Sequence, residues 1–490
     1  MSRLIPAAVL LAWLSGCAVG PRFEPPAAPT VTGYTAEPLP AQTAAAPVRD
    51  GDAQRLVAGM DVPADWWALF RSPDLDALIA DALANSPTLQ AAKAALRQAT
   101  ELRDAQRGAL LPTLQGQYTT TRQQDAVGTL SPTLSSQAPT YNLHTAQVSV
   151  SYLFDVFGAN RRRIESAGAL AEAQRFELEG AYLTLTSNVV AAAIGEASLR
   201  EQLAATNDIV RGEREIARIL RRQFEIGAIA ELDVLAQDAQ LATTEATIPT
   251  LEKQLAQQQD LLVALTGRLP SDAATPTFLL GNLTLPQDLP VSIPANLVRQ
   301  RPDVRAAEAQ LHAATADVGV AIGDLLPQIS LIASSGSAAT DFAGLFAAGN
   351  VFWAVGAGLS ETLFAGGTLV HRKRAAEAAL DEAGAQYRSV VVAAFQNVAD
   401  TLQALELDAK GVTAAARAEQ AAEQSLEATR RNVEIGATSS LAVLNAEQIY
   451  DEAQLGLAVA RANRYSDTAA LFQALGGGWW NVRADAAQRD

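Results

Sequence analysis

The stretch SPTLQAAKAALRQATELRDAQRGALLP, from Ser86 to Pro112, aligns without gaps to RPDVRAAEAQLHAATADVGVAIGDLLP, from Arg301 to Pro327, and both close on Gly-x-Leu-Leu-Pro. A second pair follows in the same order: RRQFEIGAIAELDVL from Arg221 to Leu235, and RRNVEIGATSSLAVL from Arg430 to Leu444. A shared richness in alanine does not by itself place proline, glycine and the EIG triplet at matching positions. The sequence therefore predicts an internal tandem duplication with a unit of about 210 residues.

The spacing of the prolines predicts the helices of each copy. No proline lies between Pro139 and Pro249 or after Pro327, so each copy has room for one very long helix. We expect these helices at 161–225 and 368–434, each roughly 100 Å long. Two shorter helices in each copy sum to roughly 90 Å, so stacked end to end they match one long helix. The shorter helices are expected at Pro87–Ala109, Glu231–Thr266, Pro302–Asp324 and Ser440–Leu475.

Both copies hold β-type sequence between a short helix and the long one. Four strands cannot close a barrel, and an open edge in lipid leaves backbone groups unpaired, so a barrel that spans a membrane has to be shared between chains. The alternative is a soluble antiparallel sheet that caps a helical bundle. The expected strands are Leu114–Thr121, Gln147–Phe154, Ile329–Ser337 and Phe352–Leu359, joined by loops at 122–146 and 338–351.

The N-terminus predicts export and lipidation. Arg3 precedes an apolar run from Leu4 to Leu14 that is too short to span a bilayer as a helix but suits a signal peptide. The run ends in LSGC, which resembles the bacterial lipobox. Cys17 of this motif is the only cysteine, so it has no disulfide partner within the chain, and we expect it to carry the lipid.

These features divide the chain into five segments. The arm that follows Cys17 is rich in proline and alanine and shows little periodicity, so we expect it to be extended. The expected segments are a signal peptide at 1–16, a lipidated N-terminal arm at 17–63, a first repeat at 64–285, a second repeat at 286–477 and a C-terminal tail at 478–490.

Composition and charge disfavour two classes of function. The chain has 490 residues, of which 49% are hydrophobic, and a net charge of −16 disfavours a nucleic-acid partner because phosphate binding relies on clustered Lys and Arg. The histidines His144, His312 and His371 are expected far apart in helices or loops, without metal-ligand spacing, and the sequence has no nucleophile elbow or phosphate loop. We therefore expect no enzymatic activity, no metal and no cofactor.

Several motifs together resemble one family. They are LSGC at 14–17, DWWALFRSPDLDALIADALANSP at 65–87, LVRQRPDVRAAEAQL at 297–311 and the two EIG triplets. The chain is similar to the TolC-like outer-membrane factors, in the lipoprotein branch of the OprM and NodT type that serves RND efflux pumps. The motifs are spread over nearly the whole chain.

The resemblance implies an α+β membrane protein that works as a homotrimer. Each protomer would supply four strands to a twelve-stranded outer-membrane β-barrel, continuous with a periplasmic α-helical barrel about 100 Å long. The implied partners are a periplasmic adaptor (membrane fusion protein), an inner-membrane RND transporter and outer-membrane lipid. The implied function is passive conduction of drugs or other small molecules to the outside. The alternatives are the outer-membrane duct of a type I protein secretion system and a periplasmic adaptor lipoprotein.

By the same resemblance, the two helix-turn-helix ends, here called the tips, contact the adaptor. Gly227 and Gly436 suit the left-handed backbone conformation that ends a helix, and Ser439 or Ser440 can cap the helix that follows. The adaptor-facing candidates are Gly227, Leu232, Val234, Gly436, Leu441 and Val443.

The tips are also implied to form a gate at the periplasmic end. Many relatives place an acidic residue at the position that matches Asn445, so this sequence lacks one charge there. Asp233 or Glu447 can keep the opening acidic, and Leu441 is the candidate for an apolar constriction. The gate candidates are Asp233, Leu441, Asn445 and Glu447.

Basic clusters follow the second expected strand of each copy. Cations at the start of a helix oppose its macrodipole, so another interaction must favour them. Our hypothesis is that they lie at the level of the inner-leaflet headgroups and bind anionic lipid, and the alternative is a solvated helix start. The clusters are Arg161, Arg162 and Arg163, and Arg372, Lys373 and Arg374.

Overall fold

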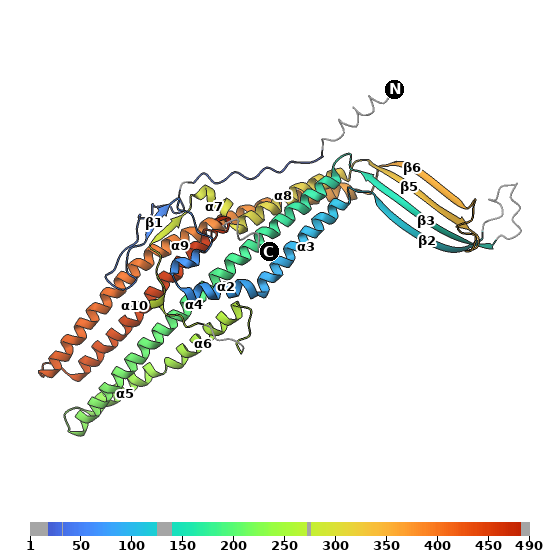
Figure 1. The fold of residues 1–490 in the computed structure, drawn as a ribbon. Coiled ribbons are helices and arrows are strands. Elements are labelled where there is room, and N and C mark those ends of the chain that lie inside the picture. The colour runs from blue at the N-terminus through green and yellow to red at the C-terminus, as the bar shows by residue number, and fades with distance from the viewer. Residues whose placement is uncertain (1–17, 32, 125–139, 272–275, 482–490) are drawn as a thin grey trace. The chain divides into compact units, whose positions relative to one another are not determined.

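A computed structural model describes residues 18–31, 33–124, 140–271 and 276–481 (Figure 1). The chain divides into two compact units. The first comprises residues 1–26, 96–174 and 307–387, and the second comprises residues 27–95, 175–306 and 388–490. The first unit contains the larger sheet, and the second contains the tips.

The same order of elements occurs twice along the chain (Figure 1). Each series has two helices, two strands, one 67-residue helix and then a returning helical segment. The first series is α2 (Pro73–Asn85), α3 (Pro87–Gly108), β2 (Thr113–Gln124), β3 (Thr140–Phe154), α4 (Ala159–Glu225), α5 (Glu231–Glu245) and α6 (Ile248–Leu265). The second series is α7 (Pro294–Gln300), α8 (Pro302–Gly323), β5 (Gln328–Ala339), β6 (Val351–Ser360), α9 (Thr368–Glu434) and α10 (Ser440–Ala474).

The two expected long helices are confirmed as α4 and α9. At the helical rise, each is roughly 100 Å long. One expectation for the shorter helices was wrong, because 231–266 is not a single helix. The segment breaks between Glu245 and Ile248, since Pro249 has no N–H to bond to the preceding turn and instead stands at the start of α6.

The larger sheet is antiparallel, with strands in the order β2, β3, β5, β6, so β2 and β6 are its edges. All four expected strands are confirmed, and each is longer than expected. β3 begins at Thr140, so the expected loop 122–146 was too long. His144, expected in a helix or loop, lies in β3. Pairing of β3 with β5 joins the strands of the two series.

A second, smaller sheet was missed. β1 (Arg55–Ala58), in the arm that was expected to be merely extended, pairs in parallel with β4 (Asp288–Val291). Arg55 donates to Asp288 across this pair at 2.6 and 2.8 Å. Strands of four residues are too short to show a period in the sequence, and their pairing partner is more than two hundred positions away, so only the folded chain identifies them.

The DWWALF segment is part of the core of the second unit. It forms a 3-10 turn, η1 (Trp66–Phe70), in which Trp66 is almost fully buried and stacks on Phe472 of α10 with ring centroids 5.4 Å apart. Phe70 packs against Tyr465, also on α10. The hydroxyl of Ser72 then accepts a hydrogen bond from the N–H of Leu75 and caps α2.

Three consecutive glycines, 476–478, end the last helix. All three have positive φ, a conformation that other residues rarely adopt. The chain then turns into η4 (Trp479–Asn481), where Trp479 donates from Nε1 to the carbonyl oxygen of Gln300 at 2.6 Å. The GGGWW run at 476–480 is therefore a helix stop followed by an anchored turn.

Candidate functional site

The larger sheet has one apolar face and one polar face. In an antiparallel pair, residues directly opposite each other point to the same face. Leu114, Val150, Ala333 and Val355 form one such row across the four strands. The rows on either side of it add Val148, Tyr152, Leu331 and Trp353 to the same face. Trp353, Val355 and Leu359 are each at least 66% exposed in the protomer, as expected for a surface that faces lipid.

The opposite face carries mainly polar or small side chains and no charged one. Gln147 donates from Nε2 to Oε1 of Gln117 at 3.2 Å, and the hydroxyls of Thr113 and Ser151 lie 2.7 Å apart. Arg122, near the C-terminal end of β2, is the one Lys, Arg, Asp or Glu in these four strands, and it lies on the same face as Leu114. The face can therefore line a wet passage without attracting either sign of charge.

Both tips are built by the same turn. At the end of α4, Gly227 donates to the carbonyl of Phe224 and Ala228 donates to that of Gln223. At the end of α9, Gly436 bonds to Val433 and Ala437 to Asn432 in the same way. This pair of bonds is the Schellman motif. Gly227 and Gly436 have φ values of 73° and 72°, as the sequence predicts.

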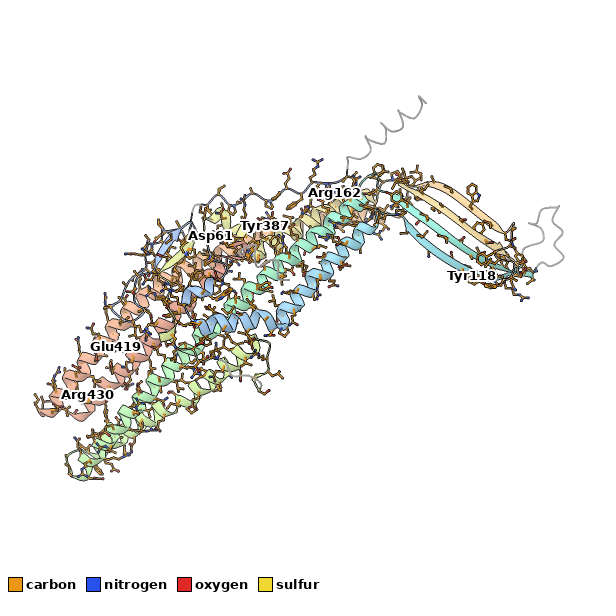
Figure 2. The ribbon with its side chains drawn as sticks, viewed as in Figure 1. Asp61, Tyr118, Arg162, Tyr387, Glu419 and Arg430 are labelled. Carbon is orange, nitrogen blue, oxygen red and sulfur yellow. The ribbon has the colours of Figure 1, made fainter. Side chains whose placement is uncertain are left out.

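Each tip joins two helices into a hairpin. Hairpin 1 is α4 with α5, linked by the ion pairs Arg214–Glu245 and Arg221–Asp238. Hairpin 2 is α9 with α10, linked by an ion pair in which the Arg430 guanidinium lies 3.1 Å from Oε1 of Glu447. Arg430 lies near the end of α9 (Figure 2). Ser439 precedes α10, but its side chain makes no capping hydrogen bond, so the expected cap is not formed by this residue.

Apolar side chains are exposed at both tips. Leu232, predicted to face the adaptor, is 73% exposed. Val234 and Val443, from the same prediction, are buried and half-buried. Sequence reasoning missed three exposed residues, although the isoleucines of the EIG triplets were a visible signal. These are Ile226, Leu235 and Ile435.

The gate candidates occupy different environments. Asp233 accepts a hydrogen bond from the N–H of Ala230 and so helps to start α5. Asn445 is exposed on α10, whereas Glu447 is buried and paired with Arg430. The side chains of Ser440 and Leu441 are not described, and Cys17 at the start of the arm lies outside the described residues.

The first basic cluster has partners within the chain. Asp155 accepts from the backbone N–H groups of Asn160 and Arg161 at 2.8 and 2.9 Å, and it also pairs with the Arg161 side chain. Arg163 pairs with Asp324. These carboxylates offset the unfavourable placing of cations at the start of α4.

Arg162 is different because it is buried and holds the N-terminal arm. Its guanidinium donates to the carbonyl oxygens of Val19 and Gly20 at 3.0 and 3.3 Å and to Glu165 at 2.7 Å (Figure 2). Phe23 of the arm stacks on His312, with ring centroids 4.3 Å apart.

The second basic cluster lies on the surface of α9. Arg372 and Arg374 are exposed, and Lys373 is half-buried and pairs with Glu377 along the helix at 3.1 Å. Of the two clusters, this one therefore has cations available to a ligand outside the chain.

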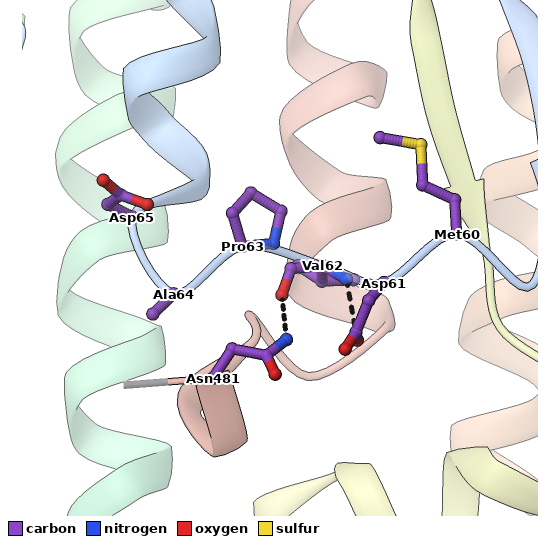
Figure 3. A pocket seen from close by; sticks show the side chains of 7 residues that line it. All are labelled: Met60, Asp61, Val62, Pro63, Ala64, Asp65 and Asn481. Carbon is purple, nitrogen blue, oxygen red and sulfur yellow. Dashed lines mark hydrogen bonds between the residues drawn. The ribbon is translucent and has the colours of Figure 1, made fainter. Parts of the chain in front are cut away.

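A groove of about 660 Å³ borders the arm and the last turn of the chain (Figure 3). Trp480 donates to Oδ1 of Asp61 at 3.0 Å, and Asn481 donates to the carbonyl oxygen of Val62 at 2.8 Å. The groove thus lies where the N-terminal arm is hydrogen-bonded to η4. Its seven lining residues do not include a nucleophile together with a general base.

Neither a metal centre nor a membrane-spanning helix emerges from the described residues. No three His, Cys, Asp or Glu side chains among them are arranged to hold a metal ion. None of the helices within those residues has an apolar stretch long enough to cross a bilayer.

Comparison with known proteins gives consistent matches over most of the chain. The sequence profile of the outer membrane efflux protein family matches residues 78–268 and 293–477. The chain is similar to the pyoverdine export outer membrane protein OpmQ of Pseudomonas putida, with 31% identity over 433 residues, 86% of this chain and 89% of that one. It is also similar to the toluene efflux pump outer membrane protein TtgF of Pseudomonas putida, with 29% identity covering 96% of this chain and 95% of that one. Among solved structures, the outer-membrane channel OprN superposes with a TM-score of 0.84 at 26% identity, covering 94% of this chain and 100% of that one.

The matching family and the two relatives named here are outer-membrane efflux or export proteins, neither enzymes nor periplasmic adaptors. The expected absence of enzymatic activity follows from these relatives, and the adaptor alternative is contradicted by them. The resemblance seen in the sequence motifs is confirmed: this chain belongs to the outer membrane efflux protein family.

Proposed function

We propose that this chain forms the homotrimeric exit duct of a tripartite RND-type efflux pump and passively conducts drugs or other small molecules across the outer membrane. The observation that carries the proposal is the four-stranded sheet with two unpaired edges, one apolar face and one uncharged polar face. In lipid, each unpaired backbone N–H or C=O group of an edge strand costs several kcal/mol. A single protomer therefore cannot place this sheet in a membrane by itself. Three copies, pairing β2 of one protomer with β6 of the next, remove every edge and give twelve strands.

The faces of the sheet support the same arrangement. The apolar face would contact lipid, and the face with Gln117 and Gln147 would line the lumen. A lumen lined by amide and hydroxyl groups hydrates cargo without holding it, which suits a duct that conducts many compounds. Selection among compounds would then occur upstream, in the inner-membrane transporter.

The tips are the proposed contact with the periplasmic adaptor. Each hairpin end presents isoleucine or leucine side chains that are at least 73% exposed, namely Ile226 and Leu232 on hairpin 1 and Ile435 on hairpin 2. Exposed apolar residues on a helical hairpin fit the groove between two helices of a partner. The iris-like gate that Asp233, Leu441, Asn445 and Glu447 were predicted to form stays a proposal at the same end.

Membrane attachment is proposed through Cys17 and through the second basic cluster. Arg162 holds the arm two residues after Cys17, so a lipid on that cysteine would be kept close to the start of α4. The exposed Arg372 and Arg374 would bind anionic headgroups, whereas the first cluster is already paired.

The proposal is tested by deleting the gene, measuring susceptibility to a panel of antibiotics, dyes and solvents, and restoring the intact gene. We expect increased susceptibility to at least one compound and full restoration. Chemical cross-linking of the purified protein should give a trimer whose sheet signal resists heat in detergent. A water-soluble monomer without such a sheet would contradict the duct and favour the soluble sheet that the sequence left open.

A further inference from the structure

Near the tips, four helices from both hairpins surround a group of carboxylates. Glu213 of α4 and Glu447 of α10 are buried, and Asp451 follows Glu447 by one helical turn on the same face. The Glu447 carboxylate of hairpin 2 lies against Gly212 of hairpin 1. A Cβ atom placed on Gly212 would be 3.3 Å from Glu447 Oε1, tighter than ordinary contact, so glycine makes room for the carboxylate.

Hydrogen-bond donors are too few for these oxygens. Thr244 and Gln240 of α5 donate to Oε1 of Glu213 at 2.9 and 3.3 Å, and Arg430 of α9 donates to Oε1 of Glu447 at 3.1 Å. Among the described residues, the second oxygen of each glutamate has no partner, and neither has Oε1 of Gln237 beside them. Unpartnered buried acceptors destabilise the packed state, because they lose hydrogen bonds to water without replacement. A carboxyl group that takes up a proton becomes a donor and relieves this shortage.

The charges also favour a bound proton. Arg430 is the cation that acts on Glu447 and Asp451, and its side chain is about half exposed. Burial, reinforced by Glu447 and Glu213, raises the pKa of Asp451 to about 7, and Arg430 only partly opposes the rise. Burial also raises the pKa values of Glu447 and Glu213. Two further acids oppose ionisation of the group: Glu245 acts on Glu213, and Glu452 acts on Asp451.

We propose that Glu213, Glu447 and Asp451 form a proton-binding site that ties hairpin 1 to hairpin 2. Separating the hairpins exposes the carboxylates to water, where they ionise near their ordinary pKa of about 4 and release the proton. Because the packed state binds more protons than the separated state between pH 4 and 7, acid stabilises the packed state and a rise in pH through 7 weakens it. One proton for each protomer changes the equilibrium by up to about tenfold per pH unit in this range.

The consequence for conduction rests on the proposed duct, which opens where these hairpins part. Through this proton-binding site, which acts as a lock between the hairpins, a duct without bound adaptor would stay closed more often at acidic pH than at neutral pH. The proton site itself stands on the packing of four helices within one chain.

The direct test follows the packing of the hairpins by limited trypsin cleavage of the full-length purified protein between pH 6 and 8. Cleavage is measured at the arginines near the tips, Arg221 and Arg222 on hairpin 1 and Arg430 and Arg431 on hairpin 2. Each rate is divided by that of an unstructured peptide at the same pH, which removes the pH dependence of trypsin. We expect the corrected rate of the wild type to rise several-fold over this range. The double variant Glu447→Gln with Asp451→Asn keeps the shape of the protonated site, so its rate should stay low and flat.

A matched control is available within hairpin 2. Asp467 of α10 has its pKa raised to about 7 by burial and by its hydrogen bond with Asp408 of α9, but this pair does not join the two hairpins. Asp467→Asn should therefore keep the pH response of the wild type. The proton site is refuted if the double variant responds to pH like the wild type, or if Asp467→Asn abolishes the response.

Conductance in planar bilayers separates this inference from the duct itself. We expect wild-type conductance to increase from pH 6 to 8 and the double variant to remain at the acid level. If wild type and variants carry no current at any pH, the duct proposal fails, while the cleavage rates still decide whether the site binds a proton. If current flows but does not depend on pH in the wild type, the lock is wrong and the duct stands.

Discussion

The Nε atom of Arg162 donates a hydrogen bond to the carbonyl oxygen of Val19 at 3.0 Å, and this contact joins the first turn of α4 to the N-terminal arm. Nearby, Gly20 adopts a φ of 97°, and a side chain on Gly20 would overlap the backbone of Gly319 in α8. From Val19 onward, the arm is thus held between α4 and α8 of the first unit.

Arg162→Ala should release the arm. The change removes three hydrogen bonds and leaves Glu165 without the Arg162 guanidinium, so we expect a loss of about 2 to 4 kcal/mol, typical of breaking a buried ion pair. Trypsin cleavage after the exposed Arg22 should become faster at temperatures where the helices remain folded. Arg161→Ala, at a partly exposed pair, should leave the rate within twofold of the wild type.

Acid should weaken the same attachment. Burial opposes ionisation of Glu165, but hydrogen bonds with His312 and Arg162 outweigh it and hold the pKa of Glu165 below its usual value. Because the pKa of Glu165 is lower in the attached state, ionised Glu165 stabilises the attachment at pH values above its ordinary pKa of 4.5. This stabilisation is lost as the pH falls from 4.5 through the lowered pKa. Cleavage after Arg22, corrected for protease activity, should therefore accelerate below about pH 4.5 in the wild type and change less in Glu165→Gln; an equal acceleration in both proteins would contradict the assignment.

Gly227→Ala should loosen the tip of hairpin 1. An alanine at a φ of 73° costs about 1 to 2 kcal/mol, whereas asparagine tolerates this region better. We expect faster trypsin cleavage at Arg221 and Arg222 in Gly227→Ala and an intermediate rate in Gly227→Asn. The same order should hold for Gly436 and cleavage at Arg430 and Arg431, because both tips use the same turn.

Charging the tips should abolish export without unfolding the protein. Ile226→Asp and Ile435→Asp place a charge on side chains that are at least 73% exposed, so the thermal unfolding temperature should stay within a few degrees of the wild type. Each variant should fail to restore drug resistance to a deletion strain. The control, Ile219→Asp, makes the same exchange on α4 away from the turn and should restore it; normal resistance in the tip variants would rule out the adaptor contact.

Neighbouring residues of β6 test the two faces of the sheet. Val355 shares a row with Leu114 and Val150, and Ala354 shares one with Gln115 and Ser149 on the opposite face. Val355→Arg should cost about 2 to 4 kcal/mol in lipid and prevent assembly of the heat-resistant trimer. Ala354→Arg should still assemble, because its side chain points to the polar face. Equal assembly of the two variants would mean that the sheet does not face lipid on one side only.

Local patterns were enough to predict most of the elements. The absence of proline between Pro139 and Pro249 and after Pro327 left room for long uninterrupted helices, and the EIG triplets placed their ends within a residue or two. The period of two in Val148, Val150 and Tyr152 identified a strand, although β3 continues to Thr140, where polar residues conceal the period. These features depend on steric and hydrogen-bonding preferences that act within a few residues, so they can be read from the sequence.

Relationships between distant segments could not be predicted in this way. Three such relationships join residues that are well over one hundred positions apart. They are the pairing of β1 with β4, the hydrogen bond from Arg162 to Val19 and the electrostatic interaction of Glu213 with Glu447. The sequence by itself determined the two-fold series of helices and strands and the composition of each face. Only the tertiary structure decided which charges are paired, which are buried together and which remain exposed, because those properties depend on the solvation and neighbours that packing creates.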